Sequence, residues 1–412
     1  MDRHNIRDRS DDAQLVRRGY APLGMMATRP TIGWRWAVVT ALVGLGLALC
    51  AGGTASASGP QASRGAVVGL PVTFNVKNTN TSRVSCPSDS ADYTVGGTLI
   101  GPRQALHSPA PKTVTIYLHS LDSGAWYWTL PLQNYNYAFE MARLGHTSLI
   151  VDRLGYDSSG HPNGFQSCVG SQADVVHQIV EQLRSAGYTA AGGESPAFTR
   201  VVLAGHSISG LISQIEAYSY RDIDGLIVNG WTDQGQTQAV QAAFAQVAVR
   251  CAVGGEPAEP GGPGGYVFFD QSDADFRANE FHQPDPAVLD AASPLRNRNP
   301  CGDMLSIPAG IAADNQGLGE IAVPVLGVFA RQDKGFQGGE EQMQLFTGSN
   351  DVTGVFLDGS GHFMALDAAA SEFRAAISGW LRQRGLVTPF RVKGCVRSSA
   401  RRPPAGCASE VP

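Results

Sequence analysis

Lysine, charge and long apolar runs are scarce in this sequence. Only four of the 412 residues are lysine and only 16% are charged, against about 25% in ordinary soluble domains. A series of apolar stretches of ~20 residues is absent, which excludes a polytopic membrane protein. No internal repeat of about 20–50 residues is visible, which argues against a solenoid.

Glycine and hydrophobic residues are abundant instead. The chain has 49 glycines and is 43% hydrophobic, which is typical of a loop-rich globular enzyme with a sizeable buried core. Its formal net charge is −5. An acidic balance argues against a nucleic-acid partner, because phosphates demand a basic surface. We expect one large domain with an excursion, or at most two domains.

The N-terminal region predicts export. Residues 36–51 form an apolar run that precedes Ala-Ser-Ala at residues 55–57, a pattern typical of signal-peptidase cleavage. We therefore predict a signal peptide with an extended n-region over residues 1–57, and a secreted protein. The run has about sixteen residues, fewer than a spanning helix needs. The alternative is an uncleaved anchor over residues 36–51, which would provide the only membrane contact that we expect.

Six cysteines would remain after cleavage, an even number suited to three disulfide bonds in an oxidising compartment. Other pairings are open, but proximity in the sequence favours Cys86–Cys168, Cys251–Cys301 and Cys395–Cys407. The sequence contains no Cys-x-x-Cys or His-x-x-x-His pair, so no metal site is expected.

Short β-branched runs alternate with segments of helical period from residue 67 onward. This pattern is typical of a mainly parallel sheet covered by helices on both faces, which is an α/β fold. The expected strands lie at residues 72–76, 93–100, 113–118, 147–151, 200–203, 225–228, 323–330 and 352–357. The expected helices lie at residues 137–144, 172–186, 209–219, 239–249 and 371–381.

The alternation breaks over residues 234–320, where a helical piece is followed by a Gly/Pro-rich stretch and several proline-punctuated turns. We interpret this stretch as an insertion over the edge of the sheet. It divides the predicted core into residues 58–233 and 321–385. Residues 386–412 are interpreted as a C-terminal tail held by a disulfide bond.

A strand, a sharp turn and a helix are predicted around residues 200–210 (RVVLAGHSISG). This setting suits a nucleophile elbow, in which Ser207 occupies the apex in a strained backbone conformation and projects its hydroxyl above the sheet. The positions two before and two after the serine must be small so that the turn can close. Gly205 meets this demand, and Ser209, which replaces the usual glycine, is a mild departure.

A serine hydroxyl is a poor nucleophile without a base and a group that orients the base. Asp333 and His362 each follow a predicted strand, so both lie at the carboxyl edge where open α/β sheets place their sites. The sequence therefore predicts a triad of Ser207, His362 and Asp333. Asp358 is the alternative acid, although its place at a strand end suits a turn cap better.

The chain resembles the α/β-hydrolase family over roughly residues 67–386, through the motifs His119-Ser120, Asp152-Arg-Leu-Gly, Gly205-His-Ser-Ile-Ser, Gln332-Asp333 and Gly361-His362. The resemblance implies an eight-stranded, mostly parallel sheet and makes the insertion a cap or lid. It also implies Ser207 as nucleophile, His362 as base and then acid, and Asp333 as the orienting group.

The same resemblance implies an oxyanion hole made of backbone N–H groups. Ile208 is one expected donor, and Ser120 or Leu121 is the other. The loop that carries the second donor departs from the family pattern, because it contains His-Ser-Leu where many members have His-Gly. Backbone donors can serve whatever side chain they carry, so the expectation stands.

Trp126, Tyr127 and His119 lie in or close to this loop, and we predict that they bind substrate. Core packing is the alternative for the two aromatic residues. The aromatic residues of the insertion have the same two alternatives: Tyr266, Phe268 and Phe269. His206 is expected to pack beside the nucleophile, and Asp152 to form a turn.

These features together predict a secreted serine hydrolase that cleaves carboxylic esters through an acyl-enzyme intermediate. The expected partner is a small-molecule ester or acyl substrate, and no metal or organic cofactor is implied. A peptidase or amidase, or a lyase with the same triad, is the first alternative. A catalytically dead binding protein is the second, and Ser209 with the missing His-Gly motif would be its first signs.

Overall fold

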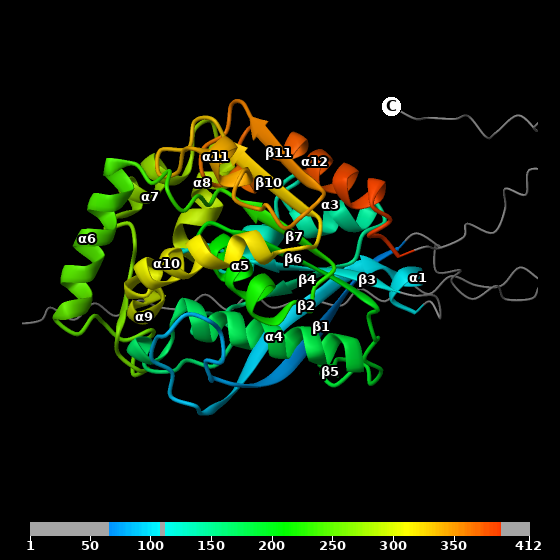
Figure 1. Cartoon of the computed structure of the whole chain (residues 1–412), viewed down its shortest axis with the longest axis horizontal. Helices are drawn as coiled ribbons and strands as arrows, with labels where there is room; N and C mark the ends of the chain where they lie inside the picture. Colours follow the sequence, from blue (N-terminus) through cyan, green and yellow to red (C-terminus); the bar gives the residue numbers. More distant parts are fainter. Residues whose placement is uncertain (1–65, 108–111, 389–412) are drawn as a thin grey trace, which may run out of the picture. The chain divides into compact units, whose positions relative to one another are not determined.

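The computed structural model describes residues 66–107 and 112–388, which form a nine-stranded sheet flanked by helices (Figure 1). Its strands are β1 (Val67–Lys77), β2 (Asp92–Pro102), β3 (Thr113–Leu118), β4 (Ser148–Val151), β5 (Thr189–Ala190), β6 (Arg200–His206), β7 (Gly225–Asn229), β10 (Val325–Ala330) and β11 (Val352–Leu357). The order across the sheet is β11-β10-β7-β6-β3-β4-β2-β1-β5. The predicted signal peptide, the anchor alternative and the Cys395–Cys407 pair lie outside the described residues.

Twelve helices accompany the strands in the described part of the chain. They are α1 (Arg103–Leu106), α2 (Trp126–Thr129), α3 (Tyr137–Arg143), α4 (Val169–Ser185), α5 (Ile208–Tyr220), α6 (Gln238–Ala252), α7 (Asp273–Glu280), α8 (Pro286–Ala292), α9 (Cys301–Leu305), α10 (Ile307–Gly317), α11 (Gly339–Met343) and α12 (Ala370–Gln383). No described helix is both long enough and apolar enough to cross a membrane.

The six strands from β11 to β4 are parallel, and β2, β1 and β5 continue the sheet in antiparallel fashion. The predicted mostly parallel sheet is therefore confirmed. It has one strand more than the eight expected, because residues 189–190 pair with Val72 and Thr73 at the edge of β1. A pairing of two residues leaves no periodic pattern in the sequence.

Alternate residues of the central strands point to opposite faces of the sheet, and helices cover both faces. In β3, Ile116 belongs to one buried cluster with α4 and α5, whereas Tyr117 belongs to another with α3 and α12. All six residues of β3 are buried. The near-continuous apolar character of such strands follows from this two-sided burial.

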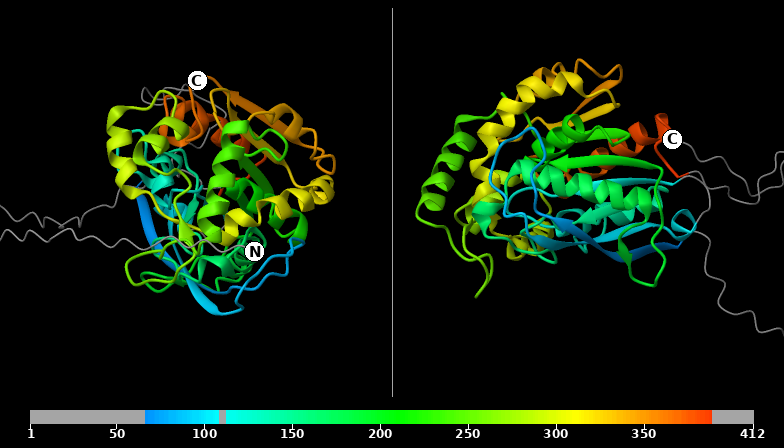
Figure 2. Two further views of the ribbon diagram at one scale, coloured as in Figure 1. Left: turned by 90° about the vertical axis from the view of Figure 1, so that its left-hand side faces the viewer. Right: turned by 60° about the horizontal axis from the view of Figure 1, so that its bottom comes forward.

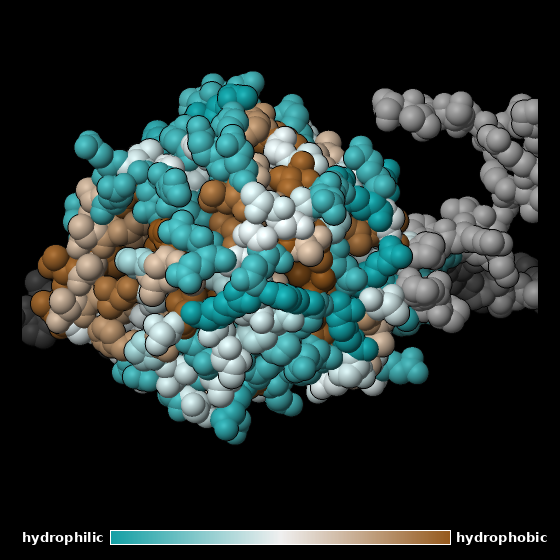
Figure 3. Space-filling view, in the orientation of Figure 1, coloured by the Kyte–Doolittle hydropathy of each residue, from teal (hydrophilic) through white to brown (hydrophobic). Residues whose placement is uncertain are grey.

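Residues 234–320 connect the neighbouring parallel strands β7 and β10 and contain α6 to α10 with a small sheet of β8 (Tyr266–Val267) and β9 (Asn299–Pro300). We call them the insertion. Its helices α6 to α9 gather beyond the carboxyl ends of the strands (Figures 1 and 2). In the space-filling view this end has a largely apolar surface (Figure 3). Val249 on α6 and Leu305 on α9 have exposed side chains.

Two disulfide bonds join the described residues, and both match predicted pairs. Cys86–Cys168 links the β1–β2 loop to the residue that caps α4. Cys251–Cys301 links the last turn of α6 to the start of α9. The second bond therefore fixes two helices of the insertion against each other.

Candidate active site

Ser207 lies between the end of β6 and the start of α5, as the elbow motif predicts. Its φ of 57° and ψ of −128° place it in a backbone conformation that non-glycine residues rarely adopt. A Cβ atom at Gly205 would lie 1.9 Å from the carbonyl oxygen of Ser209, so glycine is required there. This close approach of backbone segments forces the sharp turn that presents the serine.

The unusual residue of the elbow, Ser209, has a structural partner. Its buried hydroxyl donates a hydrogen bond to the backbone carbonyl of His119, at the end of β3. Glycine at this position could not make that contact. The departure from the family pattern thus connects the nucleophile turn directly to the loop predicted to carry the second oxyanion donor.

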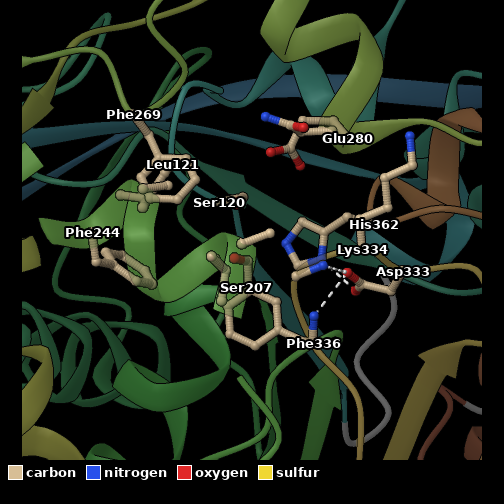
Figure 4. A pocket seen from close by; sticks show the side chains of 15 residues that line it. Ser120, Leu121, Ser207, Phe244, Phe269, Glu280, Asp333, Lys334, Phe336 and His362 are labelled. Carbon is tan, nitrogen blue, oxygen red and sulfur yellow. Dashed lines mark hydrogen bonds and ion pairs between the residues drawn. The ribbon is translucent and has the colours of Figure 1, made fainter. Parts of the chain in front are cut away.

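Asp333 and His362 come together at the carboxyl edge of the sheet. The Nδ1 atom of His362 lies 2.6 Å from the Oδ2 atom of Asp333, and both side chains are buried. The second carboxylate oxygen of Asp333 accepts the backbone N–H groups of Gly335 at 2.8 Å and Phe336 at 3.0 Å. In Figure 4 the His362 ring lies between Ser207 and Asp333.

The alternative acid, Asp358, is excluded by its position. Its side chain is 85% exposed and lies beside Arg331, with 3.6 Å between charged atoms. A different carboxylate, Asp367, holds the histidine loop: it accepts the backbone N–H groups of Gly361 at 2.8 Å and His282 at 2.7 Å. Sequence reasoning missed Asp367, since its partners are backbone groups that leave no motif.

The three predicted oxyanion donors lie next to Ser207. Within the described residues, the backbone N–H groups of Ser120 and Leu121 donate to no backbone carbonyl, and Ile208 is the first residue of α5, where a backbone N–H has no acceptor within the helix. Ser120 and Leu121 line the same cavity as Ser207. Unpaired N–H groups beside the serine hydroxyl are what binding of an oxyanion requires.

The loop that carries Leu121 is fixed by the next residue, Asp122. Asp122 has a φ of 50° and is buried. Its carboxylate accepts the backbone N–H groups of Phe269 at 2.6 Å and Asp270 at 2.9 Å, and it pairs with Arg296 at 2.9 Å. These contacts with residues of the insertion therefore hold the loop in place.

Two of the three predicted substrate-binding residues are core residues instead. His119 and Tyr127 are fully buried, Trp126 is only partly buried, and none of the three lines the cavity. Tyr127 stacks on His206 with ring centroids 4.5 Å apart. The predicted substrate contacts are thus not found at this cavity. The packing alternative fits Tyr127, whose polar end accepts the backbone N–H of Ala365 at 3.2 Å.

His119 and His206 are held in neutral forms by burial. Burial, with the nearby Arg153 guanidinium, keeps the pKa of His119 well below its usual value. Its Nδ1–H donates to the carbonyl of Ser120 at 2.9 Å, and its Nε2 accepts the backbone N–H of Arg153 at 3.1 Å. Burial and the neighbouring His362 likewise lower the pKa of His206. His206 donates a hydrogen bond to the carbonyl of His362 at 2.9 Å. Both histidines therefore hold segments of the backbone in place.

A cavity of about 90 Å³ opens beside Ser207 and His362. It is far smaller than the roughly 300–1,000 Å³ of pockets that enclose drug-sized ligands, so it suits a small substrate group. Its apolar lining comes from the oxyanion loop, α6, the segment after β8 and the Asp333 loop: Leu121, Ala239, Val240, Ala243, Phe244, Phe269 and Phe336. Of the three aromatic residues singled out in the insertion, Phe269 lines the cavity, Tyr266 is fully buried, and Phe268 is partly buried and does not line the cavity.

One titratable side chain of the cavity was not predicted from the sequence. Glu280, the last residue of α7, lines the cavity and is buried. Burial, together with the nearby carboxylates of Asp270 and Asp333, raises its pKa well above the usual value. No grouping of three or more His, Cys, Asp or Glu side chains suited to a metal ion occurs in residues 66–107 and 112–388.

Comparisons with known proteins agree with this architecture. An esterase from Thermogutta terrifontis superposes with a TM-score of 0.52 at 15% identity, covering 75% of this chain and 98% of that chain. The enol-lactonase from Burkholderia xenovorans LB400 gives a TM-score of 0.52 at 17% identity, covering 70% and 97%. Identities this low establish the fold alone.

No curated protein sequence matches the chain. A family model described as the alpha/beta hydrolase family matches residues 116–376, a range that includes the elbow serine, the buried Asp–His pair and the intervening insertion. The chain belongs to the alpha/beta hydrolase family.

Proposed function

We propose that this protein is a serine hydrolase that cleaves small carboxylic esters through an acyl-enzyme intermediate. One observation carries the proposal: the His362–Asp333 pair, at 2.6 Å, opens onto the same cavity as the strained Ser207. Asp333 accepts a hydrogen bond from the Nδ1–H of His362, and this tautomer leaves the Nε2 atom free to act as a base. Ser207 and His362 line the same cavity, and we infer that the serine hydroxyl gives its proton to this base.

In the first half of the proposed reaction, the Ser207 hydroxyl attacks the ester carbonyl while His362 takes its proton. The negative charge that develops on the carbonyl oxygen is stabilised by the N–H groups of Ile208 and of Leu121 or Ser120. The tetrahedral intermediate then collapses, the bond to the alcohol oxygen breaks, and His362 returns the proton to the leaving alcohol.

In the second half, a water molecule attacks the acyl carbonyl, and His362 accepts a proton from that water. Collapse of the second tetrahedral intermediate breaks the bond to Ser207. His362 then returns the proton to the serine oxygen, and the carboxylic acid leaves. The ester is thereby cleaved into alcohol and acid with one water consumed, and the enzyme is regenerated.

Labelling with a fluorophosphonate tests the nucleophile. The wild type should be modified at Ser207, as shown by peptide mapping, and Ser207→Ala should lose both the label and hydrolysis of p-nitrophenyl butyrate. His362→Ala should lose both as well, because the base is gone. Ser185→Ala, which removes an exposed hydroxyl on α4, is the matched control and should keep both.

Retention of label or turnover in Ser207→Ala would overturn the assignment. Absence of label in folded wild type would favour the catalytically dead binding protein. A matched anilide of butyric acid separates esterase from amidase activity, since faster cleavage of the anilide would move the proposal to the peptidase and amidase alternative.

We also propose that the protein acts outside the cytoplasm. The predicted signal peptide over residues 1–57 supports this, and so do the Cys86–Cys168 and Cys251–Cys301 bonds, which suit an oxidising compartment. The mature protein recovered from the medium should begin at Ser58. Retention in the membrane fraction with residues 36–51 intact would favour the anchor alternative.

A further inference from the structure

Phe244, on α6, lies between two apolar spaces. It lines the cavity beside Ser207, and it also lines a second, larger space of about 430 Å³ between α6 and the helices α9 and α10. We call this second space the groove. Of the described residues, Phe244 is the only one that lines both. The catalytic cavity and the groove are therefore neighbours with one side chain in common.

The groove offers a hydrocarbon surface. Among the described residues that line it, only Gln236 and Gln241 are polar, and none is charged. Its volume lies within the roughly 300–1,000 Å³ of sites that hold small organic ligands, whereas the catalytic cavity measures about 90 Å³. Space for a longer hydrocarbon chain thus exists next to the cavity but outside it. The apolar residues of the groove are Phe244, Val247, Ala248, Met304, Leu305, Ile307, Pro308 and Ile311.

Phe244 marks the boundary between two faces of α6. With 3.6 residues per turn, Ala239 and Ala243 lie on one side of Phe244 around the helix axis, and both line the cavity but not the groove. Gln241 and Ala248 lie on the other side, and both line the groove but not the cavity. Because Ala243 and Ala248 are small, the phenyl ring of Phe244 supplies most of the bulk that α6 places between the two spaces.

The Phe244 ring packs against a neighbour that is itself fixed. Its centroid lies 4.9 Å from that of Phe269, and in Figure 4 both rings lie on the opposite side of Ser207 from His362. The backbone N–H of Phe269 donates to Asp122 at 2.6 Å, and its carbonyl accepts the guanidinium of Arg250 at 3.1 Å. One disulfide bond also joins α6 to α9, the other wall of the groove. The ring is therefore held between the two spaces.

We propose that Phe244 limits the length of the hydrocarbon chain that this hydrolase accepts. The inference rests on the proposed function of the site and narrows its substrate class to short-chain esters. The ring closes the cavity on the side of the groove, so a longer chain could enter only by displacing it. Without the ring, the cavity and the groove would join into one apolar channel that accepts such a chain.

The size of the effect follows from the burial of methylene groups. Full burial of one methylene strengthens binding by about fourfold, and an octanoate chain has four more of them than a butyrate chain. Burial in the groove is incomplete, since Leu305, which lines it, is 46% exposed. We therefore expect a gain of about tenfold or more for the longer chain when the ring is removed.

Two pairs of esters test the inference, one for each side of the ester bond. The acyl pair is p-nitrophenyl octanoate and p-nitrophenyl butyrate, and the alcohol pair is octyl acetate and butyl acetate. The ratio of kcat/KM for the longer ester to that for the shorter is measured below the solubility limit of each. For at least one pair this ratio should be well below one in wild type, and Phe244→Ala should raise it by about tenfold or more.

Three further variants separate the groove from a general change in the site. Phe244→Leu also removes the ring and should raise the same ratio by less, so it serves if Phe244→Ala does not fold. Ala248→Phe places a ring in the groove; alone it should leave both ratios unchanged, and combined with Phe244→Ala it should cancel the gain. Phe139→Ala, which removes a 41% exposed ring on α3, is the matched control and should change neither ratio. Fluorophosphonate labelling reports that each variant is folded with a reactive serine.

A wild-type ratio of one or more for both pairs would overturn the role of Phe244, because longer chains would then not be excluded. Unchanged ratios in labelled Phe244→Ala would overturn it too. So would a gain that survives in the Phe244→Ala/Ala248→Phe variant, since a wider cavity and not the groove would then hold the chain. All three results leave the proposed hydrolase intact, whereas hydrolysis that persists in Ser207→Ala would overturn the proposed function on which the inference rests.

Discussion

At the scale of single residues, Ser209 departs from the family motif, and its side chain makes a contact that glycine could not make. Its hydroxyl donates to the carbonyl of His119, and the N–H groups of the following residues, Ser120 and Leu121, are the proposed oxyanion donors. Ser209→Ala should therefore lower kcat by about 10- to 100-fold with little change in KM, because a small shift of the oxyanion loop misplaces a transition-state contact.

Steady-state kinetics on p-nitrophenyl esters measures this effect. Ser213→Ala is the control on the same helix, because the equally buried Ser213 hydroxyl bonds its own helix at the carbonyl of Ser209, at 2.7 Å. If both variants lose activity to the same degree, packing of α5 and not the contact with His119 is responsible.

Asp333 is expected to set the tautomer of His362. Asp333→Asn keeps an oxygen for the N–H groups of Gly335 and Phe336 but places an amide NH₂ opposite the Nδ1 atom. The imidazole then moves its proton to Nε2 and can no longer act as a base, so kcat should fall by about 10⁴-fold. Asp358→Asn should have no such effect; equal losses in both variants would reopen the choice of acid.

Much of this residue-level chemistry could be predicted from the sequence. Ser207, Asp333 and His362 lie in the turn or loop that follows a strand-like run, and parallel strands bring their carboxyl ends to one edge. Glu280, Asp367 and Asp122 could not be found in this way. They lie outside the predicted motifs. Glu280 reaches the site because the insertion folds over the edge of the sheet, whereas Asp122 and Asp367 act by holding backbone N–H groups.

At the scale of elements, α4 is joined to the end of α5 by a titratable pair. The Nδ1 atom of His177, on α4, lies 2.7 Å from Asp222, and its ring stacks on Tyr220 at 4.1 Å. The hydrogen bond with Asp222 raises the pKa of His177. A raised folded-state pKa gives stabilisation that is complete below the unfolded value of about 6.5 and is lost as the pH rises through the folded value.

The melting temperature of wild type should accordingly exceed that of His177→Gln by more at about pH 6 than at about pH 9. Thermal unfolding followed by circular dichroism at both pH values measures the difference. His107→Gln, at an exposed position, controls for loss of a histidine in general. A difference that is independent of pH would show that stacking on Tyr220, and not the charge, carries the contribution.

Elements were predictable where burial imposes a long, regular pattern. The bounds of β3 and β11 agree with the expected strands, and α3 and α12 differ from the expected helices by one or two residues. The path of the insertion was not predictable beyond α6. Its helices α7, α8 and α9 have eight residues or fewer and are separated by prolines and glycines, so they show too few turns for a helical period.

At the scale of the whole molecule, the two disulfide bonds stabilise different parts of the described fold. Each closes a long loop, of 82 residues for Cys86–Cys168 and 50 for Cys251–Cys301. Replacing either pair by serines should lower the free energy of unfolding by about 2–4 kcal/mol. Only the Cys251→Ser/Cys301→Ser variant should also raise KM, because α6 supplies one wall of the cavity.

Denaturant unfolding and ester kinetics on the two double variants test this separation. The Cys86→Ser/Cys168→Ser variant serves as the control, since its bond lies in the β1–β2 and α4 region. An equal rise of KM in both variants would mean that general loosening, and not the position of α6, controls substrate binding.

The connection between β7 and β10 is much longer than its topology demands. A crossover between adjacent parallel strands needs only about a dozen residues or somewhat more, and α10, which packs against α5, returns the chain to the sheet. The sequence and length of the stretch from α6 to α9 can therefore change without altering the order of the strands. The same stretch supplies Phe244 and Glu280 to the cavity. Evolution or an engineer could exchange this stretch for another and thereby change the substrate specificity of an inherited catalytic core.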